Sequence, residues 1–383
     1  MTPCTPHTQR TQHARTVGTV SRLWRWVLVG LGVTALAAAP GAAGALPVAQ
    51  SGVSAQDLLA AVQNSAATPY SGYAQSTGGL VLPVTDQLSA LTNLLGDTTT
   101  MRTWWRAADD WRVDTVLLSG ERDLYRSQTG LWMWDYEANH AVLAPEPAAR
   151  LPREADLLPT QLGLRLLSEV QPAEVSRLPT LRIAGRDAPG LRLLPNDRQS
   201  TVTEVDVWAD ATTGLPLRVD VLGAGADRPG VTTSFLDFST DVPDAATTRF
   251  TPPPGSDVHQ QAATDIAAFA DRLPDARAPS QLAGLAARDR LTGSVGAVGT
   301  YGRGVTALAA VPLPQRSAAG LRSQLAATPG AVTDADGVAV SVGPLSLRLT
   351  GALGGRRVWL LSGTVTADTL TSAARELAAG PPR

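Results

Sequence analysis

The chain has 383 residues and a formal net charge of −2, and all 32 of its basic side chains are arginine because the sequence contains no lysine. Four arginines and no acidic residue fall in residues 1–45, which leaves 28 basic against 34 acidic side chains in the rest of the chain. Binding to nucleic acid depends on neutralising phosphates, so this acidic balance argues against a nucleic-acid partner.

Residues 1–45 are predicted to be a signal peptide or a signal anchor. Arg22 and Arg25 precede an apolar run, and the small residues at 43–45 form a suitable cleavage motif. Pro40 interrupts the run before it reaches the length of a typical membrane span. We therefore expect an exported, extracytoplasmic protein that is either secreted or anchored to the cell membrane by this segment.

Residues 46–258 are predicted to form a first domain of helices and antiparallel strands. Ser54 is a suitable N-cap for a helix, and leucines at helical spacing indicate a second helix over 85–95. A third helix is expected within 157–170. Alternating segments separated by turn residues predict strands at 68–84, 99–107, 111–118, 124–128, 131–135, 140–143, 178–185, 189–195, 200–210, 214–223 and 230–239.

Three consecutive prolines within Arg249–Gly255 cannot donate to a central strand, so this stretch is placed at an edge or at the exit from the sheet. Residues 259–290 are expected to be a linker or helical spacer. Residues 291–383 then predict a small α+β domain with the order ββαββα, which begins with a hairpin that turns at Gly302–Gly304.

Five of the nine tryptophans, which are the most distinctive feature of the sequence, lie within residues 104–134. Side chains alternate between the two faces of a strand, so Trp132, Trp134 and Tyr136 share one face. Leu131 and Met133 share the other face. Both faces are therefore apolar, which favours a sheet that is covered on both sides.

The order of these segments resembles the superfamily of LolA lipoprotein carriers and MucB/RseB sigma-factor regulators over roughly residues 54–258. The segments that carry the resemblance are Tyr70–Gly72, Thr103–Arg106, Trp111–Val113, Leu131–Asp135, Asp210–Val219 and, as a closing strand, Phe250–Gly255. The resemblance implies an α+β fold with an N-terminal curved antiparallel half-barrel sheet of about eleven strands and covering helices, followed here by the small C-terminal domain. Members of that superfamily bind acyl chains or lipoproteins on the concave side.

The resemblance also implies a set of site residues. The expected lining of an apolar lipid cavity is Trp105, Trp111, Val113, Trp132, Trp134 and Tyr136. Arg102, Arg106 and Arg112 are candidates for contact with a lipid headgroup. The alternative is that the aromatic residues are ordinary core and that the arginines pack their stems on the sheet with their heads in water.

Two-domain length is similar to the MucB/RseB branch, in which the smaller domain contacts an anti-sigma factor. The predicted function is therefore that of a non-enzymatic envelope protein that binds a lipid or acylated polypeptide. Residues 291–383 would report this binding to a membrane anti-sigma factor in a stress response. The alternative is a diffusible lipoprotein or lipid carrier, and cleavage of the leader would distinguish the two.

Catalytic, metal and cofactor sites are not expected. The only cysteine, Cys4, lies in the leader, and no Gly-x-Ser-x-Gly motif is present. His140 and His259, the only histidines beyond the leader, are far apart in the sequence and have no ligand pattern around them. The pair Asp109–Asp110 falls in a predicted turn, where aspartate is favoured for conformational reasons.

Overall fold

The computed structural model describes residues 48–80, 94–117, 120–147, 150–261, 278–288, 297–351 and 357–380. The predicted leader and most of the predicted helix at 85–95 lie outside these residues. Val48–Arg383 form one compact unit. Among the described residues, no helix combines the length and the apolar character that a membrane crossing requires.

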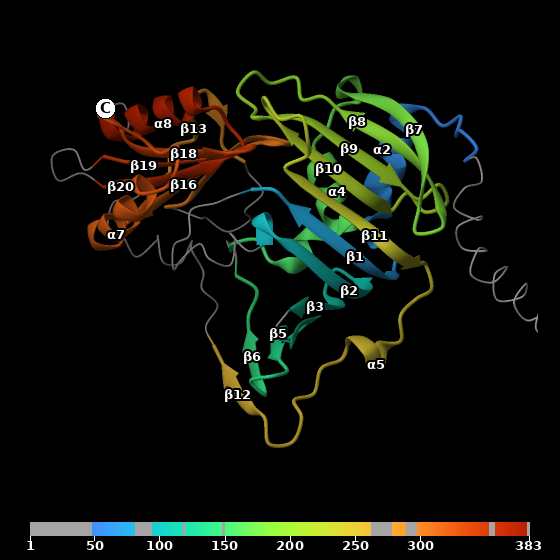
Figure 1. The fold of residues 1–383 in the computed structure, drawn as a ribbon. Coiled ribbons are helices and arrows are strands. Elements are labelled where there is room, and N and C mark those ends of the chain that lie inside the picture. The colour runs from blue at the N-terminus through green and yellow to red at the C-terminus, as the bar shows by residue number, and fades with distance from the viewer. Residues whose placement is uncertain are drawn as a thin grey trace, which may run out of the picture. The chain divides into compact units, whose positions relative to one another are not determined.

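The fold is α+β and is dominated by a curved, unclosed sheet of twelve strands (Figure 1). Their order across the sheet is β12-β6-β5-β4-β3-β2-β1-β11-β10-β9-β8-β7. Neighbours are antiparallel except for β12, which pairs in parallel with β6. The strands are β1 (Tyr70–Gly78), β2 (Thr98–Ala107), β3 (Asp110–Leu117), β4 (Gly120–Ser127), β5 (Gly130–Asp135), β6 (His140–Ala144), β7 (Val175–Ile183), β8 (Arg186–Leu193), β9 (Val202–Ala209), β10 (Pro216–Gly223), β11 (Val231–Ser239) and β12 (Asp257–Gln260).

Two helices cover one face of this sheet. Helix α2 (Ala55–Asn64) starts at Ser54, whose side chain accepts a hydrogen bond from the Asp57 N–H as an N-cap. Helix α4 (Pro159–Leu167) starts with a proline, which is favoured at the first helical position, and follows the 3₁₀ turn η2 (Glu154–Leu157). Helix α2 contacts β7 and β8, and α4 contacts β10. We call this side of the sheet the helix-covered face.

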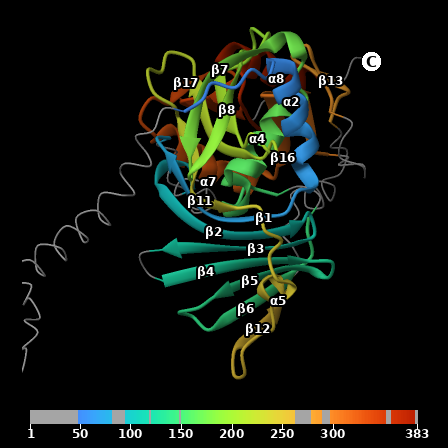
Figure 2. The same cartoon turned by 90° about the vertical axis from the view of Figure 1, so that its right-hand side faces the viewer.

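The chain between β11 and the end of β12 crosses the other face of the sheet, and we call residues 240–260 the strap. Its short helix α5 (Ala245–Thr248) contacts β2 and β3. Phe250 packs on Tyr125 of β4 and on Trp132 and Trp134 of β5. Figures 1 and 2 show the strap leaving β11, passing α5 and ending beside β6. The three prolines lie outside the strands, as the sequence predicts for an exit. Phe250–Gly255, the expected closing strand, is therefore not a strand, and the last strand of the sheet is β12 at Asp257–Gln260.

A second sheet with the strand order β15-β16-β20-β19-β18-β17 follows. In β20 the side chains alternate between two cores, because Val358 packs with α7 residues and Leu361 packs with α8 residues, so the helices lie on opposite faces. The elements are β15 (Gly299–Arg303), β16 (Thr306–Leu313), α7 (Gln315–Ala326), β17 (Val332–Asp334), β18 (Gly337–Val342), β19 (Leu345–Thr350), β20 (Val358–Gly363) and α8 (Ala367–Ala379).

The observed order of this part, ββαββββα, contains two strands more than the predicted ββαββα. Residues 337–351 form a hairpin because Gly343, which has φ 54°, turns the chain, and β17 is too short to show an alternating pattern. The expected spacer at 259–290 also differs, since it contains part of β12 and the hairpin β13 (Gln281–Leu282) and β14 (Leu285–Ala286). Leu282 is buried in the α8 core, so this small structure begins before residue 291.

Candidate functional site

A row of stacked aromatic rings forms the centre of the helix-covered face. Tyr70, Trp105 and Trp111 lie directly opposite one another on β1, β2 and β3. The Trp105 ring is stacked on Tyr70 at 5.9 Å and on Trp111 at 5.1 Å between ring centroids. Phe235 of β11 meets Tyr70 edge-on. We call these four residues the aromatic wall, and all of them are buried.

The segment from η2 into α4 covers the aromatic wall. Leu157 and Leu158 are buried in the same core as the aromatic rings. The Thr160 hydroxyl donates a hydrogen bond to the Tyr70 hydroxyl, and the Thr233 hydroxyl donates one to the Leu157 carbonyl at 2.7 Å. Burial raises the pKa of Tyr70, so its phenol stays neutral. The covering segment is therefore held by hydrogen bonds as well as by apolar contact.

Among the described residues, three buried hydroxyl groups on this face have no hydrogen-bond partner, and Thr103 of β2 is one of them. Ser76 of β1 and Thr115 of β3 are buried on this face, on either side of β2. A buried hydroxyl without a partner costs about 1–3 kcal/mol, so such groups usually meet a bound water or a polar group of a guest molecule. Val113, which is fully buried, lies between the wall and the hydroxyls of Ser76 and Thr115.

The six side chains expected to line one cavity are divided between the two faces. Trp105, Trp111 and Val113 belong to the helix-covered core. Trp132 and Trp134 lie on the opposite face in a cluster with Phe250 of the strap. Tyr136 follows β5 in a turn and is 69% exposed. The predicted parity of β5 is confirmed, because Leu131 and Met133 join the core of the helix-covered face.

The three arginines expected at a headgroup all lie on the strap side and contact carboxylates. The Arg112 guanidinium is 2.6 Å from Asp114 and 4.8 Å from the centre of the Tyr125 ring. Arg106 pairs with Asp110 at 2.8 Å and donates to a strap carbonyl. Arg102, which is half exposed, is 3.9 Å from Glu121. None of these three arginines lies beside the aromatic wall.

A buried acidic pair accompanies Arg112 under the strap side. Asp114 and Asp123 face each other across β3 and β4, and they are 1% and 5% exposed. The pKa of Asp123 is raised to about 7, chiefly by burial and also by the charge of Asp114, while the charge of Arg112 opposes both effects. The pKa of Asp114 is also raised, chiefly by burial. The pair therefore tends to hold a proton near neutral pH.

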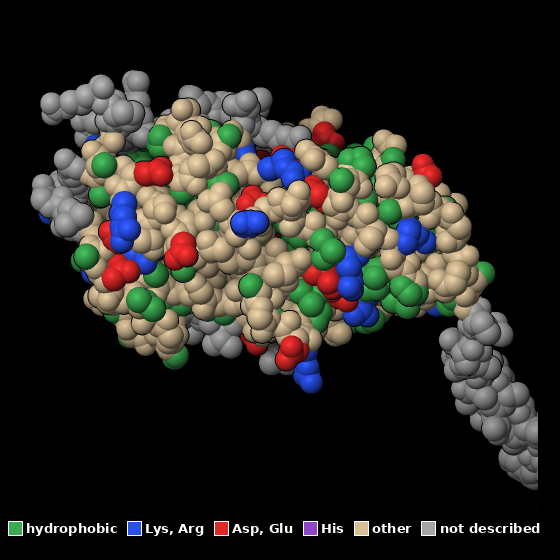
Figure 3. Space-filling model, turned by 90° about the horizontal axis from the view of Figure 1, so that it is seen from above, with side chains coloured by type: hydrophobic (Ala, Val, Ile, Leu, Met, Phe, Trp, Pro, Cys, Tyr) green, Lys and Arg blue, Asp and Glu red, His purple; other side chains and the backbone are tan. Residues whose placement is uncertain are grey.

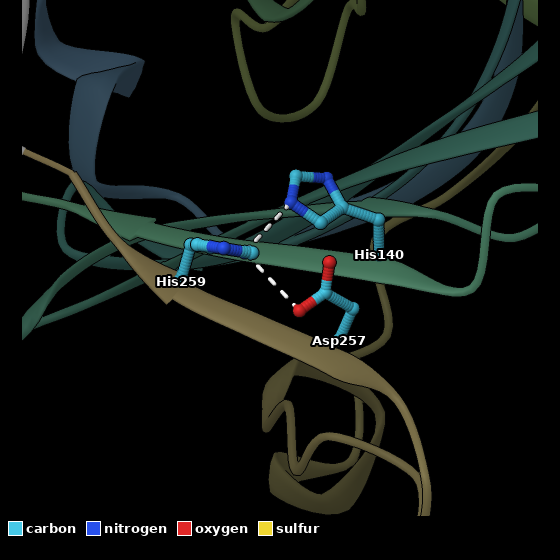
Figure 4. A group of neighbouring side chains, drawn as sticks. All are labelled: His140, Asp257 and His259. Carbon is cyan, nitrogen blue, oxygen red and sulfur yellow. Dashed lines mark hydrogen bonds and ion pairs between the residues drawn. The ribbon is translucent and has the colours of Figure 1, made fainter.

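The two histidines that are far apart in the sequence meet at the edge of the sheet. The parallel pairing of β12 with β6 places His140 opposite Asp257, and His259 follows two residues later on the same face (Figure 4). His140 Nε2 is 3.1 Å from His259 Nδ1, which is 3.4 Å from an Asp257 oxygen. The sequence did not predict this cluster, because only the parallel pairing of β12 with β6 brings the two histidines together.

The charged surface is mixed rather than dominated by one sign. Figure 3 shows arginine and acidic side chains interspersed on the face seen from above. Many of the described arginines are within ion-pair distance of a carboxylate, as Arg192 is with Asp206 at 2.7 Å. This distribution gives no continuous basic track on that face for a phosphate backbone.

Comparison with known families identifies the central part of the large sheet. Residues 96–238 match the model of the MucB/RseB N-terminal domain. The match runs from the start of β2 to the end of β11, so it includes the tryptophans of the wall but not Tyr70 or the strap. No curated protein sequence matches the chain.

Solved structures show low similarity across much of the chain. "Crystal structure of MucB in complex with MucA(peri)" has a TM-score of 0.45 and 17% identity, and it covers 84% of this chain and 96% of that chain. The Pseudomonas aeruginosa MucA/MucB complex has a TM-score of 0.46 and 16% identity over 84% of this chain and 96% of that chain. A LolA superfamily protein from Nitrosomonas europaea has a TM-score of 0.19 and 13% identity, and it covers 49% of this chain and 92% of that chain.

The family model matches four of the six segments that carry the resemblance in the sequence, and Tyr70–Gly72 and Phe250–Gly255 lie outside it. Residues 96–238 are therefore similar to the MucB/RseB N-terminal domain, and the family match is limited to this part of the chain.

Proposed function

We propose that this chain is a non-enzymatic, extracytoplasmic protein that binds a lipid or an acylated polypeptide against the aromatic wall and signals this state to a membrane anti-sigma factor. The observation that carries the proposal is the pair of buried, unpartnered hydroxyls of Ser76 and Thr115 beside the wall. An acyl chain could pack on the rings while its ester or carboxyl oxygen accepts hydrogen bonds from these hydroxyls.

Binding would require the covering segment to move. Trp105 and Trp111 are each only 7% exposed, and Leu158 is fully buried against them. A guest would therefore displace the chain around η2 and the start of α4, and the contacts of Thr160 and Thr233 would open. The covering segment would then have one position when a lipid is bound and another when it is not. A partner protein that binds one of these two conformations more tightly would detect the bound lipid.

The test is lipid analysis combined with one pair of matched variants. Lipid extracted from protein purified under native conditions is identified by mass spectrometry, and a fluorescent fatty acid is titrated into delipidated protein. Thr115→Leu places a larger apolar group beside the wall and removes the hydroxyl, so we expect fatty-acid affinity to fall by about tenfold or more. Thr100→Leu is the control, because Thr100 lies on β2 on the opposite face.

The proposal fails if native protein carries no lipid and delipidated protein binds no fatty acid. It also fails if Thr115→Leu and Thr100→Leu bind equally well. Circular dichroism and thermal melting of both variants would show that a loss of binding does not come from unfolding.

The part of the proposal that concerns the partner rests on the family and on the presence of a second α+β structure after the large sheet. Fractionation of cells and N-terminal sequencing separate the regulator from a carrier, since a retained leader suits an anchored regulator and a freely diffusing protein suits a carrier. Titration of the whole protein with the extracytoplasmic segment of an anti-sigma factor, with and without fatty acid, then tests the coupling. Equal affinity in both conditions would contradict signalling of the lipid state.

A further inference from the structure

The cluster at the sheet edge has the composition and spacing of a transition-metal site. Its members are His140 of β6 with Asp257 and His259 of β12, and one ligand atom from each lies within 4.8 Å of the other two. All three side chains point to the same side of the strand pair, and they converge on one point (Figure 4). Histidine and carboxylate are ligands that Zn²⁺ prefers.

Two of the three distances between ligand atoms agree with the geometry of a metal shell. Zinc–nitrogen and zinc–oxygen bonds of about 2.0–2.2 Å at tetrahedral angles separate two ligand atoms by about 3.3 Å. His140 Nε2 and His259 Nδ1 are 3.1 Å apart, and His259 Nδ1 and the Asp257 oxygen are 3.4 Å apart. A single hydrogen bond between the imidazoles accounts for the first distance. It does not account for a carboxylate directed at the same ring nitrogen.

The surroundings of the cluster leave room for an ion. The His259 and Asp257 side chains are 59% and 67% exposed, so an ion could enter without rearrangement of the core and could keep water in its remaining position. The neighbouring Asp135, which pairs with His140 in the sheet, is engaged in accepting a hydrogen bond from the Ala138 N–H at 2.9 Å.

We propose that His140, Asp257 and His259 bind a divalent transition-metal ion, represented by Zn²⁺, and that the ion fastens the strap to the edge of the large sheet. The strand β12 has four residues, all of them exposed, and it lacks a buried side chain that would hold it. An ion bound by His140 of β6 and by Asp257 and His259 of β12 would hold β12 against β6 without apolar packing. This inference does not depend on the proposed lipid function.

Isothermal titration of the untagged full chain with ZnCl₂ tests the proposal. We expect one high-affinity ion per chain, and we expect His259→Asn or His140→Asn to weaken binding by at least about tenfold. The double variant His7→Asn/His13→Asn removes the other two histidines of the sequence, so it is the matched control and should bind like the wild type.

Hydrogen exchange supplies a second, structural readout. The Asp257 N–H donates to the Asn139 carbonyl and the Gln261 N–H donates to the Leu143 carbonyl, both at 3.0 Å. We expect Zn²⁺ to slow exchange at these two amides in the wild type and in the His7/His13 variant, but not in His259→Asn. The proposal is overturned if the wild type binds no Zn²⁺, if the His140 and His259 variants keep full affinity, or if the control loses it.

Discussion

The two faces of strands β2 to β5 carry the same residue types but use them differently. On the helix-covered face, tryptophans stack on one another and on Tyr70 within an apolar core. On the strap side, the Arg112 guanidinium lies over the rings of Trp104 and Tyr125. The buried carboxylates of Asp114 and Asp123 lie next to it. Aromatic residues therefore form an apolar surface on the helix-covered face, whereas on the strap side they pack against a guanidinium group. The number of aromatic residues in a strand alone does not show where a lipid would bind.

The largest expected difference between the faces is in stability. Trp105→Ala empties space in a closed core, so we expect it to lower the free energy of unfolding by about 3–5 kcal/mol. Trp132→Ala should cost clearly less, because Trp132 is only partly buried and packs mainly on Phe250. Urea denaturation of the two variants measures this, and equal losses would show that the two faces do not differ as described.

The second prediction concerns pH and the acidic pair. Because the folded-state pKa of Asp123 is raised to about 7, the folded protein binds more protons than the unfolded chain between about pH 4 and pH 7. The free energy of unfolding should therefore fall as pH rises through this window. Asp123→Asn should flatten the profile, by about 2 kcal/mol between the two ends. A wild-type profile that rises through the window would contradict this assignment.

The third prediction tests how the strap is held. Phe250 is partly buried against Tyr125, Trp132 and Trp134, so Phe250→Ala should lower stability by about 1–2 kcal/mol. The rate of hydrogen exchange should rise at β12, which loses the packing of the strap on β4 and β5. The rates at β1 to β3 should stay almost unchanged. Phe238→Ala, on β11 within the core, is the comparison, and it should affect the wall instead.

The smallest effect is expected from the unpartnered hydroxyl of Thr115. Thr115→Val removes a polar group that has no hydrogen bond and keeps the shape, so stability should stay the same or rise by about 1 kcal/mol. Fatty-acid affinity should fall in the same variant if the hydroxyl contacts the guest. A fall in stability would indicate that the hydroxyl has a hydrogen-bond partner, such as a bound water, in the free protein.

The sequence predicted local features well because they depend on neighbouring residues. The strand at 131–135 is found within a residue of its predicted ends, and the first helix begins directly after Ser54 as predicted. The division of Trp132 and Trp134 from Leu131 and Met133 is also confirmed, since alternation fixes it. Alternation does not determine which apolar face of the sheet the helices cover. The sequence therefore could not show that the six expected cavity residues are divided between the two faces.

Long-range pairing explains the rest of the differences. His140 and His259 are 119 residues apart, and only the parallel addition of β12 to β6 brings them together. Parallel pairing requires a long crossover, so nothing in the residues next to either histidine indicates it. The path of the strap is set in the same way, by contacts of Phe250 with strands that are far from it in the sequence.

The strap also has a consequence for the order of assembly. The strap contacts β2, β3 and β6, so it can dock only after these strands have formed. These contacts join segments that are far apart in the sequence, and forming them therefore carries an entropic cost of loop closure. We therefore expect the strap to dock last in folding and to detach first under mechanical load. Docking of the strap would therefore mark the end of folding. Limited proteolysis with a protease that cuts only the undocked strap would measure the fraction of molecules that have not reached this state.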